Sequence, residues 1–403
     1  MRYLLVILTL FTVLSCDKNE TEFLTFGTYR GQLKVNDTVQ LPFTFKVKDA
    51  NTLEIYNAEE VIEVDEIEYK NDSVYIKLPV FEGILVAKIT DQTLNGRFLV
   101  EEKGRQQAFT ASKNNSRFDN NAKAETNITG NWQTVFSPNT EADRYVAKGV
   151  FTQNENIVTG TFLTETGDYR YLEGVVNGNQ LQLSTFDGAH AFMFTGTVTD
   201  STINGQFYSG NHWKEPFTAK RNEGYQLKSA DQLTYLKEGY DTLAFTFPDA
   251  DGNQVSLTDA QFKNKVTVVQ IMGTWCPNCL DESKYYTSYY NANKDKDIQF
   301  VALAFEYAKT EEKAFSFIKR LQDRLNITYP ILLAQTGTTS KSKANEKLPM
   351  LNHVLSYPTS IFIDKKGKVR KIHTGFNGPA TGDKFTEFKT DFTTFIDQLL
   401  EEE

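Results

Sequence analysis

Cysteine is scarce in this sequence, with three residues among 403. A small secreted scaffold stapled by disulfides, or a metal cluster held by many cysteines, needs more of them, so both classes are excluded. Basic residues are also in the minority, because 43 Lys and Arg stand against 52 Asp and Glu, a net charge of −9. Since a nucleic-acid-binding surface carries an excess of basic residues, we expect no nucleic-acid partner.

The remaining composition is that of a globular protein with several cores. Hydrophobic residues make up 40% of the chain and charged residues 24%, which is too little bias for a disordered protein. At about 150 residues per domain, the length allows two to three domains. The aromatic share of 13%, mostly 30 Phe and 19 Tyr, favours β-structure.

The N-terminal apolar run is too short to cross a bilayer, which takes about 20 apolar residues. Residues 3–14 (YLLVILTLFTVL) follow one arginine and precede Ser15. A positive residue, a short apolar run and a small residue are typical of a secretory signal peptide, which we expect at residues 1–15. A short N-terminal anchor is the alternative, and the small Ser15 disfavours it.

Residues 13–16 (VLSC) resemble a bacterial lipobox. The resemblance implies cleavage before Cys16, lipidation of its thiol and a mature chain of residues 16–403. Each buried CH₂ of an acyl chain contributes about 0.8 kcal/mol, so several chains on one cysteine form a firm anchor. We therefore expect membrane attachment by lipid at Cys16, with residues 17–22 as a short solvated tether.

The other two cysteines lie in residues 273–279 (GTWCPNC), between the apolar run 266–272 and an expected helix. A C-x-x-C pair between a strand and a helix is the arrangement of thioredoxin-type redox sites. Cys276 would stand at the helix N-terminus, where unpaired N–H groups and the helix dipole favour a thiolate. Cys279, one turn further on, would close the disulfide, and Pro277 suits the first helical turn because no N–H partner is needed there.

Other interpretations of the cysteine pair are weaker. Half a zinc site would need two more ligands, and His353 and His373 are twenty residues apart, which is unlike a zinc finger. A buried inert pair does not fit the Trp-Cys-Pro context. A peroxidase motif would require Pro and Thr where Val269 and Gly273 stand. We expect no metal and no cofactor besides the dithiol.

Residues 27–114 and 130–222 repeat each other, which is the first signal to seek in a long chain. The matches keep their order: residues 81–83 (FEG) with 186–188 (FDG), 91–98 (DQTLNGRF) with 200–207 (DSTINGQF), and 109–114 (FTASKN) with 217–222 (FTAKRN). This pattern indicates a duplicated unit.

Each repeat consists of short alternating runs separated by turn dipeptides such as Asn-Gly and Asp-Gly, which supply the positive φ of tight hairpins. Strands spaced by about 8–12 residues favour an antiparallel barrel or sandwich. We expect β-repeat 1 at residues 24–115 and β-repeat 2 at residues 128–222, joined by the polar stretch 113–127. One larger barrel built by both repeats is the alternative. His190 and His212 fall near turns of the second repeat, where ordinary polar turn residues are favoured over a ligand site.

Residues 240–403 have the texture of an α/β domain. Continuous apolar runs at 266–272 and 300–305 indicate strands covered on both faces. Thr310 and the acids after it begin a helix that runs to about Leu325. The last helix carries one apolar stripe, which predicts core packing against the sheet: Phe385, Phe388, Phe392, Phe395 and Leu399.

This third part resembles the TlpA-like family of thioredoxin-fold thiol-disulfide oxidoreductases. The resemblance rests on residues 247–257, on 274–279 (TWCPNC) with Glu282 in C-x-x-C-x-x-E spacing, and on 357–359 (YPT) before an apolar strand. It implies an α/β thioredoxin-like domain with a redox disulfide between Cys276 and Cys279.

The resemblance also implies a division of roles. Cys276 would attack a substrate disulfide and Cys279 would resolve the mixed disulfide. Glu282 would manage the proton of Cys279, the alternative being an exposed helix acid. Trp275, Tyr357 and a cis Pro358 would form the substrate-binding face; an X-Pro bond is cis in only about 5–6% of cases, so this assignment comes from the family.

The sequence departs from the family at two places: the first leaves no acid at position 270, and the second, which also occurs in more oxidising relatives, bears on the direction of electron flow. Gln270 stands where the family usually has Asn, and Pro277 is the first rather than the second residue between the cysteines. We expect an envelope thiol-disulfide oxidoreductase, facing the periplasm, that reduces protein disulfides and is supplied by an unidentified membrane thiol donor. The alternative is a lipid-anchored β-repeat binding protein whose thioredoxin-like domain is structural or regulatory.

Overall fold

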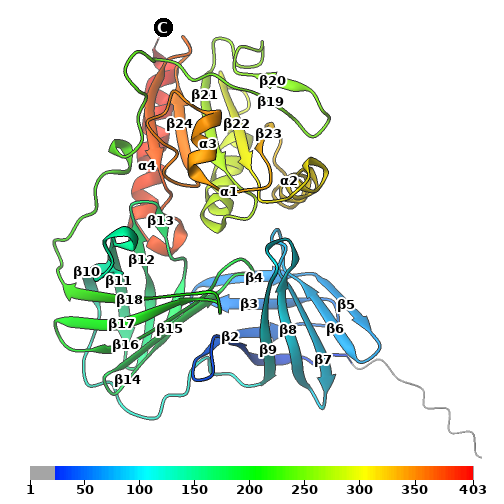
Figure 1. The fold of residues 1–403 in the computed structure, drawn as a ribbon, viewed down its shortest axis with the longest axis vertical. Helices are drawn as coiled ribbons and strands as arrows, with labels where there is room; N and C mark the ends of the chain where they lie inside the picture. The colour runs from blue at the N-terminus through cyan, green and yellow to red at the C-terminus, as the bar shows by residue number, and fades with distance from the viewer. Residues whose placement is uncertain (1–22, 403) are drawn as a thin grey trace, which may run out of the picture.

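The computed structural model describes residues 23–402, so the predicted signal peptide and the predicted lipidation at Cys16 lie outside the described residues. Two β-sheet modules lie side by side, and a thioredoxin-like α/β unit sits across them (Figure 1). The fold class predicted from the sequence is thereby confirmed.

The first module is a nine-stranded antiparallel sheet in the order β4-β3-β2-β1-β9-β8-β7-β6-β5. Its side chains alternate between core and solvent, as the period of a half-buried strand requires. Its strands are β1 Gly27–Lys34, β2 Gln40–Val47, β3 Leu53–Asn57, β4 Glu60–Val64, β5 Glu66–Lys70, β6 Ser73–Lys77, β7 Ile84–Thr90, β8 Thr93–Val100 and β9 Arg105–Lys113, with the short helix η1 Glu101–Lys103 before β9.

The second module has the strand order β11-β10-β18-β17-β16-β15-β14-β12-β13. An additional pairing of β11 with β12 closes this sheet into a barrel, whereas no such pairing joins β4 to β5 within the described first module. The strands are β10 Gly130–Phe136, β11 Tyr145–Asn154, β12 Ile157–Thr164, β13 Gly167–Asp168, β14 Leu172–Asn177, β15 Gln180–Phe186, β16 Ala191–Val198, β17 Thr202–Ser209 and β18 Trp213–Arg221.

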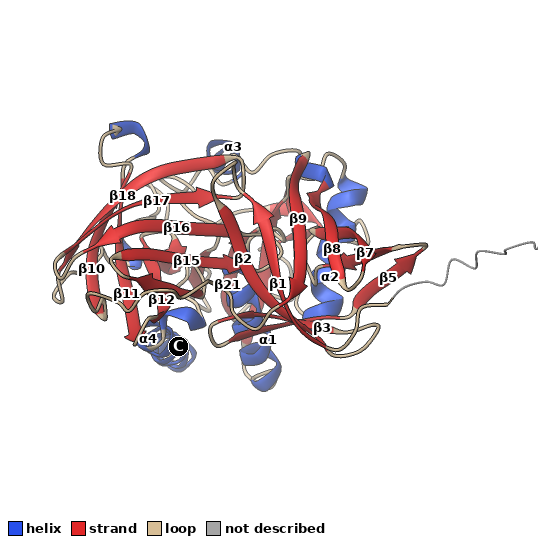
Figure 2. Cartoon of the chain, turned by 90° about the horizontal axis from the view of Figure 1, so that it is seen from below, coloured by secondary structure: helices blue, strands red, loops and turns tan. Residues whose placement is uncertain are grey.

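The two sheets share no strand pairing among the described residues, so the alternative of one larger barrel is wrong. They instead pack against each other, as the view from below shows (Figure 2). Phe43 of β2 meets Phe186 of β15 with ring centroids 4.4 Å apart. Arg117, in the stretch predicted as a linker, is buried between the modules and donates to the backbone carbonyl of Tyr56 and to Ser184 Oγ.

Matching segments of the two repeats meet each other at this contact. A Cβ added to Gly83 would lie 2.4 Å from the carbonyl oxygen of Gly188, its counterpart in the other repeat. The β17–β18 turn likewise touches strand β9, because Asn211 Nδ2 donates to Gln106 O over 3.0 Å. The turns after β8 and β17 are therefore neighbours.

The C-terminal unit has a five-stranded sheet in the order β23-β22-β21-β24-β25, with β21, β22 and β23 parallel and the other pairings antiparallel. Its elements are the hairpin β19 Thr246–Pro248 and β20 Gln254–Ser256, then β21 Val266–Met272, α1 Pro277–Ala292, β22 Ile298–Phe305, α2 Glu311–Leu325, β23 Ile331–Gln335, α3 Lys341–Lys347, β24 Thr359–Ile363, β25 Val369–Thr374 and α4 Asp383–Glu401.

The apolar runs at 266–272 and 300–305 form fully buried strands, as predicted. Helix α2 begins after the N-cap Thr310, whose hydroxyl accepts from the Lys313 N–H, and ends at Leu325. On α4, Phe392 and Leu399 are buried in the core. None of the helices between residues 23 and 402 has the length and apolar composition needed to span a bilayer.

Helix α2 also contacts the first module at the gap between β4 and β5. Arg324 donates to both oxygens of Asp65, at 2.6 and 2.8 Å, and Arg320 Nη2 lies 2.6 Å from Glu66 Oε1. Val80 and Phe81 of the first module belong to the core of the C-terminal unit. The C-terminal unit is thus packed directly against the first module and is not merely connected to it by a linker.

Candidate active site

Helix α1 begins at the cysteine motif because the local sequence supplies both a cap and a helix start. Cys276 is the N-cap, and its Sγ accepts from the backbone N–H of Cys279 over 3.2 Å. Pro277 follows at the first helical position, where its missing N–H costs nothing. The first sulfur therefore lies at the positive end of the helix dipole.

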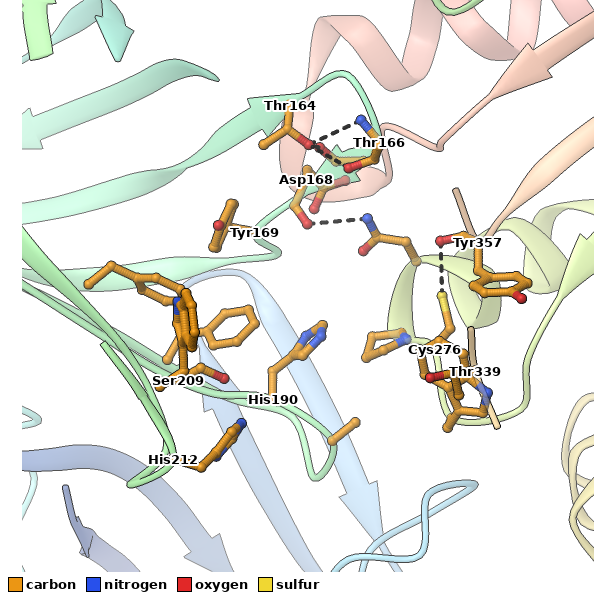
Figure 3. Close-up of a pocket in the computed structure, with 18 of the residues that line it drawn as sticks. Thr164, Thr166, Asp168, Tyr169, His190, Ser209, His212, Cys276, Thr339 and Tyr357 are labelled. Atoms are coloured by element: carbon orange, nitrogen blue, oxygen red, sulfur yellow. Dashed lines mark hydrogen bonds between the residues drawn. The ribbon is translucent and has the colours of Figure 1, made fainter. Parts of the chain in front are cut away.

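The two cysteines are joined in a disulfide, with their Cα atoms 5.2 Å apart. Cys279 is fully buried, and Cys276 keeps 6% of its surface exposed. The Tyr357–Pro358 peptide bond is cis, as the family resemblance implied. The Tyr357 carbonyl oxygen lies 3.4 Å from Cys276 Sγ (Figure 3), so the backbone before the cis-proline borders the outer sulfur.

Trp275 is held on the same face by two contacts. Its indole N–H donates to the Phe305 carbonyl over 2.9 Å, and its ring meets that of Tyr357 edge-on with centroids 5.5 Å apart. The ring is only half-buried, and it lines the space in front of Cys276. Trp275, Tyr357 and Cys276 thus share one surface, as expected for a substrate-binding face.

Glu282 is completely buried, so its interpretation as an exposed helix acid is wrong. Its carboxylate accepts from Gln270 Nε2 at 2.8 Å, from Ser360 Oγ at 2.9 Å and from the Tyr286 hydroxyl at 3.2 Å. Burial raises the pKa of Glu282 to about 7, against the lowering effect of these three donors. Gln270 Nε2 also lies 3.5 Å from the Cys279 carbonyl oxygen, so Gln270 links the acid to the turn that carries the inner sulfur.

A second buried acid near the cysteines was not predicted from the sequence. Glu306, directly after β22, accepts from the Thr274 N–H and from Thr274 Oγ1, both at 2.7 Å. Burial raises its pKa to about 7, and the Thr274 bonds and the charge of Lys103 act in the opposite direction. Glu306 therefore fixes the segment before Trp275.

A loop of the second barrel packs against the active-site helix and the cis-proline loop. Asn278, between the cysteines, donates from Nδ2 to the Asp168 carbonyl oxygen over 3.2 Å. Ser356 Oγ donates to the Thr166 carbonyl over 2.8 Å, and a Cβ on Gly375 would lie 2.7 Å from the carbonyl carbon of Thr166. Residues 164–170, named here the barrel loop, therefore cover one flank of the redox site (Figure 3).

The barrel loop is anchored by a buried ionic cluster that joins all three parts of the chain. Arg170 pairs with Asp281 of α1, with Glu60 of the first module and, at 3.6 Å, with Asp187 of the second. Its side chain is only 3% exposed. The guanidinium is thus surrounded by carboxylates from segments far apart in the sequence, which lowers the cost of burying each charge.

In front of Cys276 lies a cavity of about 940 Å³, named here the junction cavity. Its walls come from the redox unit (Trp275, Cys276, Tyr357), from the mouth of the second barrel (Tyr169, Phe192, Phe207) and from the first module (Lys103, Arg105). His190, Ser209 and His212 face Cys276 and Tyr357 across it in Figure 3. His190 and His212, favoured as ordinary turn residues on sequence grounds, are therefore wall residues of this cavity.

The histidines considered as zinc ligands have partners elsewhere. His353 Nε2 lies 3.0 Å from the Leu233 carbonyl, and His373 Nδ1 lies 2.7 Å from Asp231 Oδ1. Between residues 23 and 402, the structure places no three His, Cys, Asp or Glu side chains in an arrangement suited to a metal ion.

The fold and the site together define a class: a thiol-disulfide oxidoreductase of the thioredoxin fold. A cysteine pair at a helix N-terminus, a cis-proline beside the outer sulfur and a central parallel strand pair are its elements. In agreement, residues 237–390 match the Redoxin family model.

Curated relatives match the same region. The thioredoxin-like protein YneN of Bacillus subtilis is 29% identical over 151 residues, which cover 38% of this chain and 79% of the relative. The thiol-disulfide oxidoreductase ResA of Bacillus thuringiensis is 28% identical over 134 residues, 33% of this chain and 68% of that protein. A solved putative protein disulfide isomerase from Bacteroides thetaiotaomicron aligns over 42% of this chain and 93% of its own, with 18% identity and a TM-score of 0.30.

Proposed function

We propose that this protein reduces disulfides of other proteins in the cell envelope, where it is held by lipid on Cys16 and faces the periplasm. Residues 24–115 and 128–222 are the β-repeat domains of this proposal, and residues 240–403 are the redox domain. The dithiol is its own redox carrier, with no further cofactor. The observation that carries the proposal is the disulfide between Cys276 and Cys279 at the N-terminus of α1, bordered by the cis Tyr357–Pro358 bond.

The reaction begins from the reduced dithiol. The Cys276 thiolate attacks one sulfur of the substrate disulfide, forms a mixed disulfide and releases the first substrate thiolate. Cys279 then loses its proton, attacks Cys276 Sγ and releases the second thiolate. Two electrons pass to the substrate, and the enzyme ends in the disulfide form, which a membrane thiol donor reduces again.

Glu282 is the proposed acceptor of the Cys279 proton. It lies one helical turn beyond Cys279, and its pKa of about 7 suits reversible proton transfer at neutral pH. Trp275, Tyr357 and Pro358 bind the substrate in this scheme. The Tyr357 carbonyl, 3.4 Å from Cys276 Sγ, would pair with an extended substrate backbone at the attacked sulfur.

A disulfide-reduction assay with the purified mature chain tests the proposal. Wild type should be faster than Cys276→Ser, and equal rates would leave the β-repeat binding protein as the better account. Redox titration of the cysteine pair then gives the direction of electron flow. A potential near −270 mV, about that of thioredoxin, supports a reductant, whereas one near −120 mV, about that of DsbA, indicates an oxidant.

The location has a separate test. Cys16→Ala should release the protein into the soluble fraction of cells, because the variant cannot carry the lipid. A Ser15→Ala control keeps a small residue before the cysteine and should remain attached. Firm attachment of Cys16→Ala would contradict the lipid anchor.

A further inference from the structure

One wall of the junction cavity belongs to the second β-barrel. Disulfide exchange at Cys276 does not by itself require this wall. Opposite Cys276 stands the open mouth of the closed barrel, lined by aromatic rings: Tyr145, Tyr169, Phe192, Phe207 and Trp213. The volume of about 940 Å³ lies in the range of about 300–1,000 Å³ that bound organic groups occupy in proteins. Barrel mouths are a recurring place for such sites.

The polar groups at the base of the barrel mouth are hydrogen-bonded to one another. The Tyr145 hydroxyl donates to Glu215 Oε1 over 2.9 Å and is also bonded to the Tyr169 hydroxyl. Ser137 Oγ donates to Glu215 Oε2 over 2.5 Å. At the rim, Trp213 remains 47% exposed. The barrel therefore offers ring surfaces to an occupant, and an aromatic side chain would gain both burial and ring contacts there.

The first module adds positive charge to the same cavity. Lys103 Nζ lies 4.7 Å from the ring centroid of Tyr307 and 5.4 Å from that of Trp275. Neither Lys103 nor Arg105 forms a salt bridge within residues 23–402. Burial, together with the charge of Arg105, lowers the pKa of Lys103 to about 8. Burial, together with the charges of Arg105 and Lys103, lowers the pKa of His212 to about 4. The buried Glu306 carboxyl acts on Lys103 in the opposite direction and Asp168 lines the same cavity, so the positive charge of Lys103 and Arg105 is offset in part.

The residues that the two β-repeats contribute to the rim of the cavity come from equivalent connections. Lys103 lies in the connection between β8 and β9, and Arg105 begins β9. In the second repeat, His212 lies in the connection between β17 and β18, and Ser209 and Trp213 stand on either side of it. The barrel loop, to which Asn278 and Ser356 are bonded, forms a further part of the wall of this cavity beside Cys276. Cys276 thus borders the junction cavity together with both sets of turn residues.

We propose that the junction cavity is a specificity site for an acidic, aromatic peptide segment that carries the substrate disulfide. An aromatic side chain enters the barrel mouth, a carboxylate lies against Lys103 and Arg105, and the adjacent cysteine sulfur meets Cys276. The inference rests on the proposed function for its chemistry, with the enzyme dithiol as the electron source. Peptide binding itself requires no turnover.

Calorimetric titration of the full-length protein in its disulfide form tests the binding. The probes are a peptide of the pattern Asp-Tyr-Ser-Asp, with serine in place of cysteine, and its counterpart Lys-Tyr-Ser-Lys. The acidic peptide should bind at least 10-fold more tightly at low salt, and its affinity should fall as salt is added. Equal affinities, or no binding of either peptide, would overturn the proposal.

Matched variants locate the binding. The double variant Lys103→Gln, Arg105→Gln should reduce the preference for the acidic peptide to less than 3-fold, whereas Arg97→Gln, an exposed arginine on β8 outside the cavity wall, should leave it unchanged. Trp213→Ala should weaken binding of the tyrosine peptide several-fold more than that of an alanine analogue. If the double variant and the Arg97 control behave alike, the cations are not the determinants and the proposal fails.

Turnover of a small neutral disulfide separates this inference from the proposed function. If wild type reduces hydroxyethyl disulfide but shows no preference among peptides, the specificity site is wrong and the oxidoreductase stands. If wild type binds the acidic peptide selectively but turns over no disulfide faster than Cys276→Ser, the reductase proposal fails and the binding site stands.

Discussion

Asn278 donates a hydrogen bond from its side chain to the Asp168 carbonyl oxygen over 3.2 Å, so a residue between the two redox cysteines is bonded to the second β-barrel. Asp168 in turn accepts from the Gly378 N–H through Oδ2 at 2.7 Å. The barrel loop is thereby bonded to the active-site helix and to the loop before α4. We therefore expect a change in the barrel loop to alter the position of the segment that carries the disulfide.

Asn278→Ala should loosen the barrel loop without unfolding the protein. One hydrogen bond is worth about 1 kcal/mol, so the free energy of unfolding should fall by about that amount. Amide hydrogen exchange at residues 164–170 should become faster. Ser288→Ala, an exposed site on the same helix, is the control and should change neither quantity.

Arg170→Met should be far more damaging, because it removes the buried guanidinium that Asp281, Glu60 and Asp187 share. Lys284 beside Asp281 and His190 beside Asp187 would be the partners that remain. Removing one partner of a buried ion pair costs about 3–5 kcal/mol. Denaturant unfolding should show this loss, whereas the exposed Arg97→Met should stay within about 0.5 kcal/mol of wild type. A loss as small as that of the control would mean that the cluster contributes little to holding the three parts together.

Glu282 makes stability depend on pH in a direction opposite to that of a salt-bridged acid. Its pKa is about 7 in the folded protein, above the ordinary value of 4.5. Between these values the folded state binds more protons than the unfolded state, so the free energy of unfolding falls as pH rises from about 4.5 to 7, by up to about 3 kcal/mol. Urea unfolding of Glu282→Gln should show a shallower slope in this window.

Glu306 has the same raised pKa of about 7 and contributes to the same window. Glu306→Gln is therefore the matched comparison for Glu282→Gln: each variant should remove part of the slope, and the double variant should remove most of it. An unchanged slope in both single variants would contradict the assignment of these carboxyls.

Glu282→Gln should also separate the two chemical steps. If Glu282 accepts the Cys279 proton, attack by Cys276 continues but resolution slows by about 10²-fold, the lower range for general-base catalysis. The mixed disulfide should accumulate, and acid quenching with mass spectrometry would detect it. Resolution in wild type should quicken as pH rises through about 7, and this inflection should vanish in the variant.

Tyr286→Phe is the control for this kinetic test. It removes one of the three donors to Glu282 and leaves the carboxyl in place. The inflection should persist in this variant with a somewhat higher midpoint, because a bond to the charged form is lost. A profile that loses its inflection would point to a structural effect in place of proton transfer.

The redox site could be predicted from the sequence because its parts are contiguous. Residues 266–279 place an apolar strand, a turn and the C-x-x-C pair in one segment, and residues 357–359 mark the cis-proline. The strand and helix bounds followed from local patterns, such as the Thr310 cap of α2. The duplication could be recognised because the matching segments kept their order, whereas the sequence left open whether the repeats form two sheets or one larger barrel.

The surroundings of the disulfide could not be predicted in this way. Lys103 lies over the Trp275 ring and Asp168 accepts from Asn278, each across more than a hundred residues of chain, and no local pattern marks such contacts. The burial of Glu282 also depends on Ser360 from a distant strand. The one available signal was the duplication, since equivalent turns of two packed repeats tend to lie together, as the turns after β8 and β17 do.

The C-terminal unit covers the gap between β4 and β5 of the first module. Within the described residues β4 and β5 are the edge strands of this sheet, with no strand paired on their outer side, and such edges recruit other chains. Arg320 and Arg324 of α2 hold the junction of these strands, and Phe81 is inserted into the redox core. We therefore expect a chain that ends before residue 240 to self-associate through the edge strands of its first module. The second module, which the β11–β12 pairing closes, should not associate in this way.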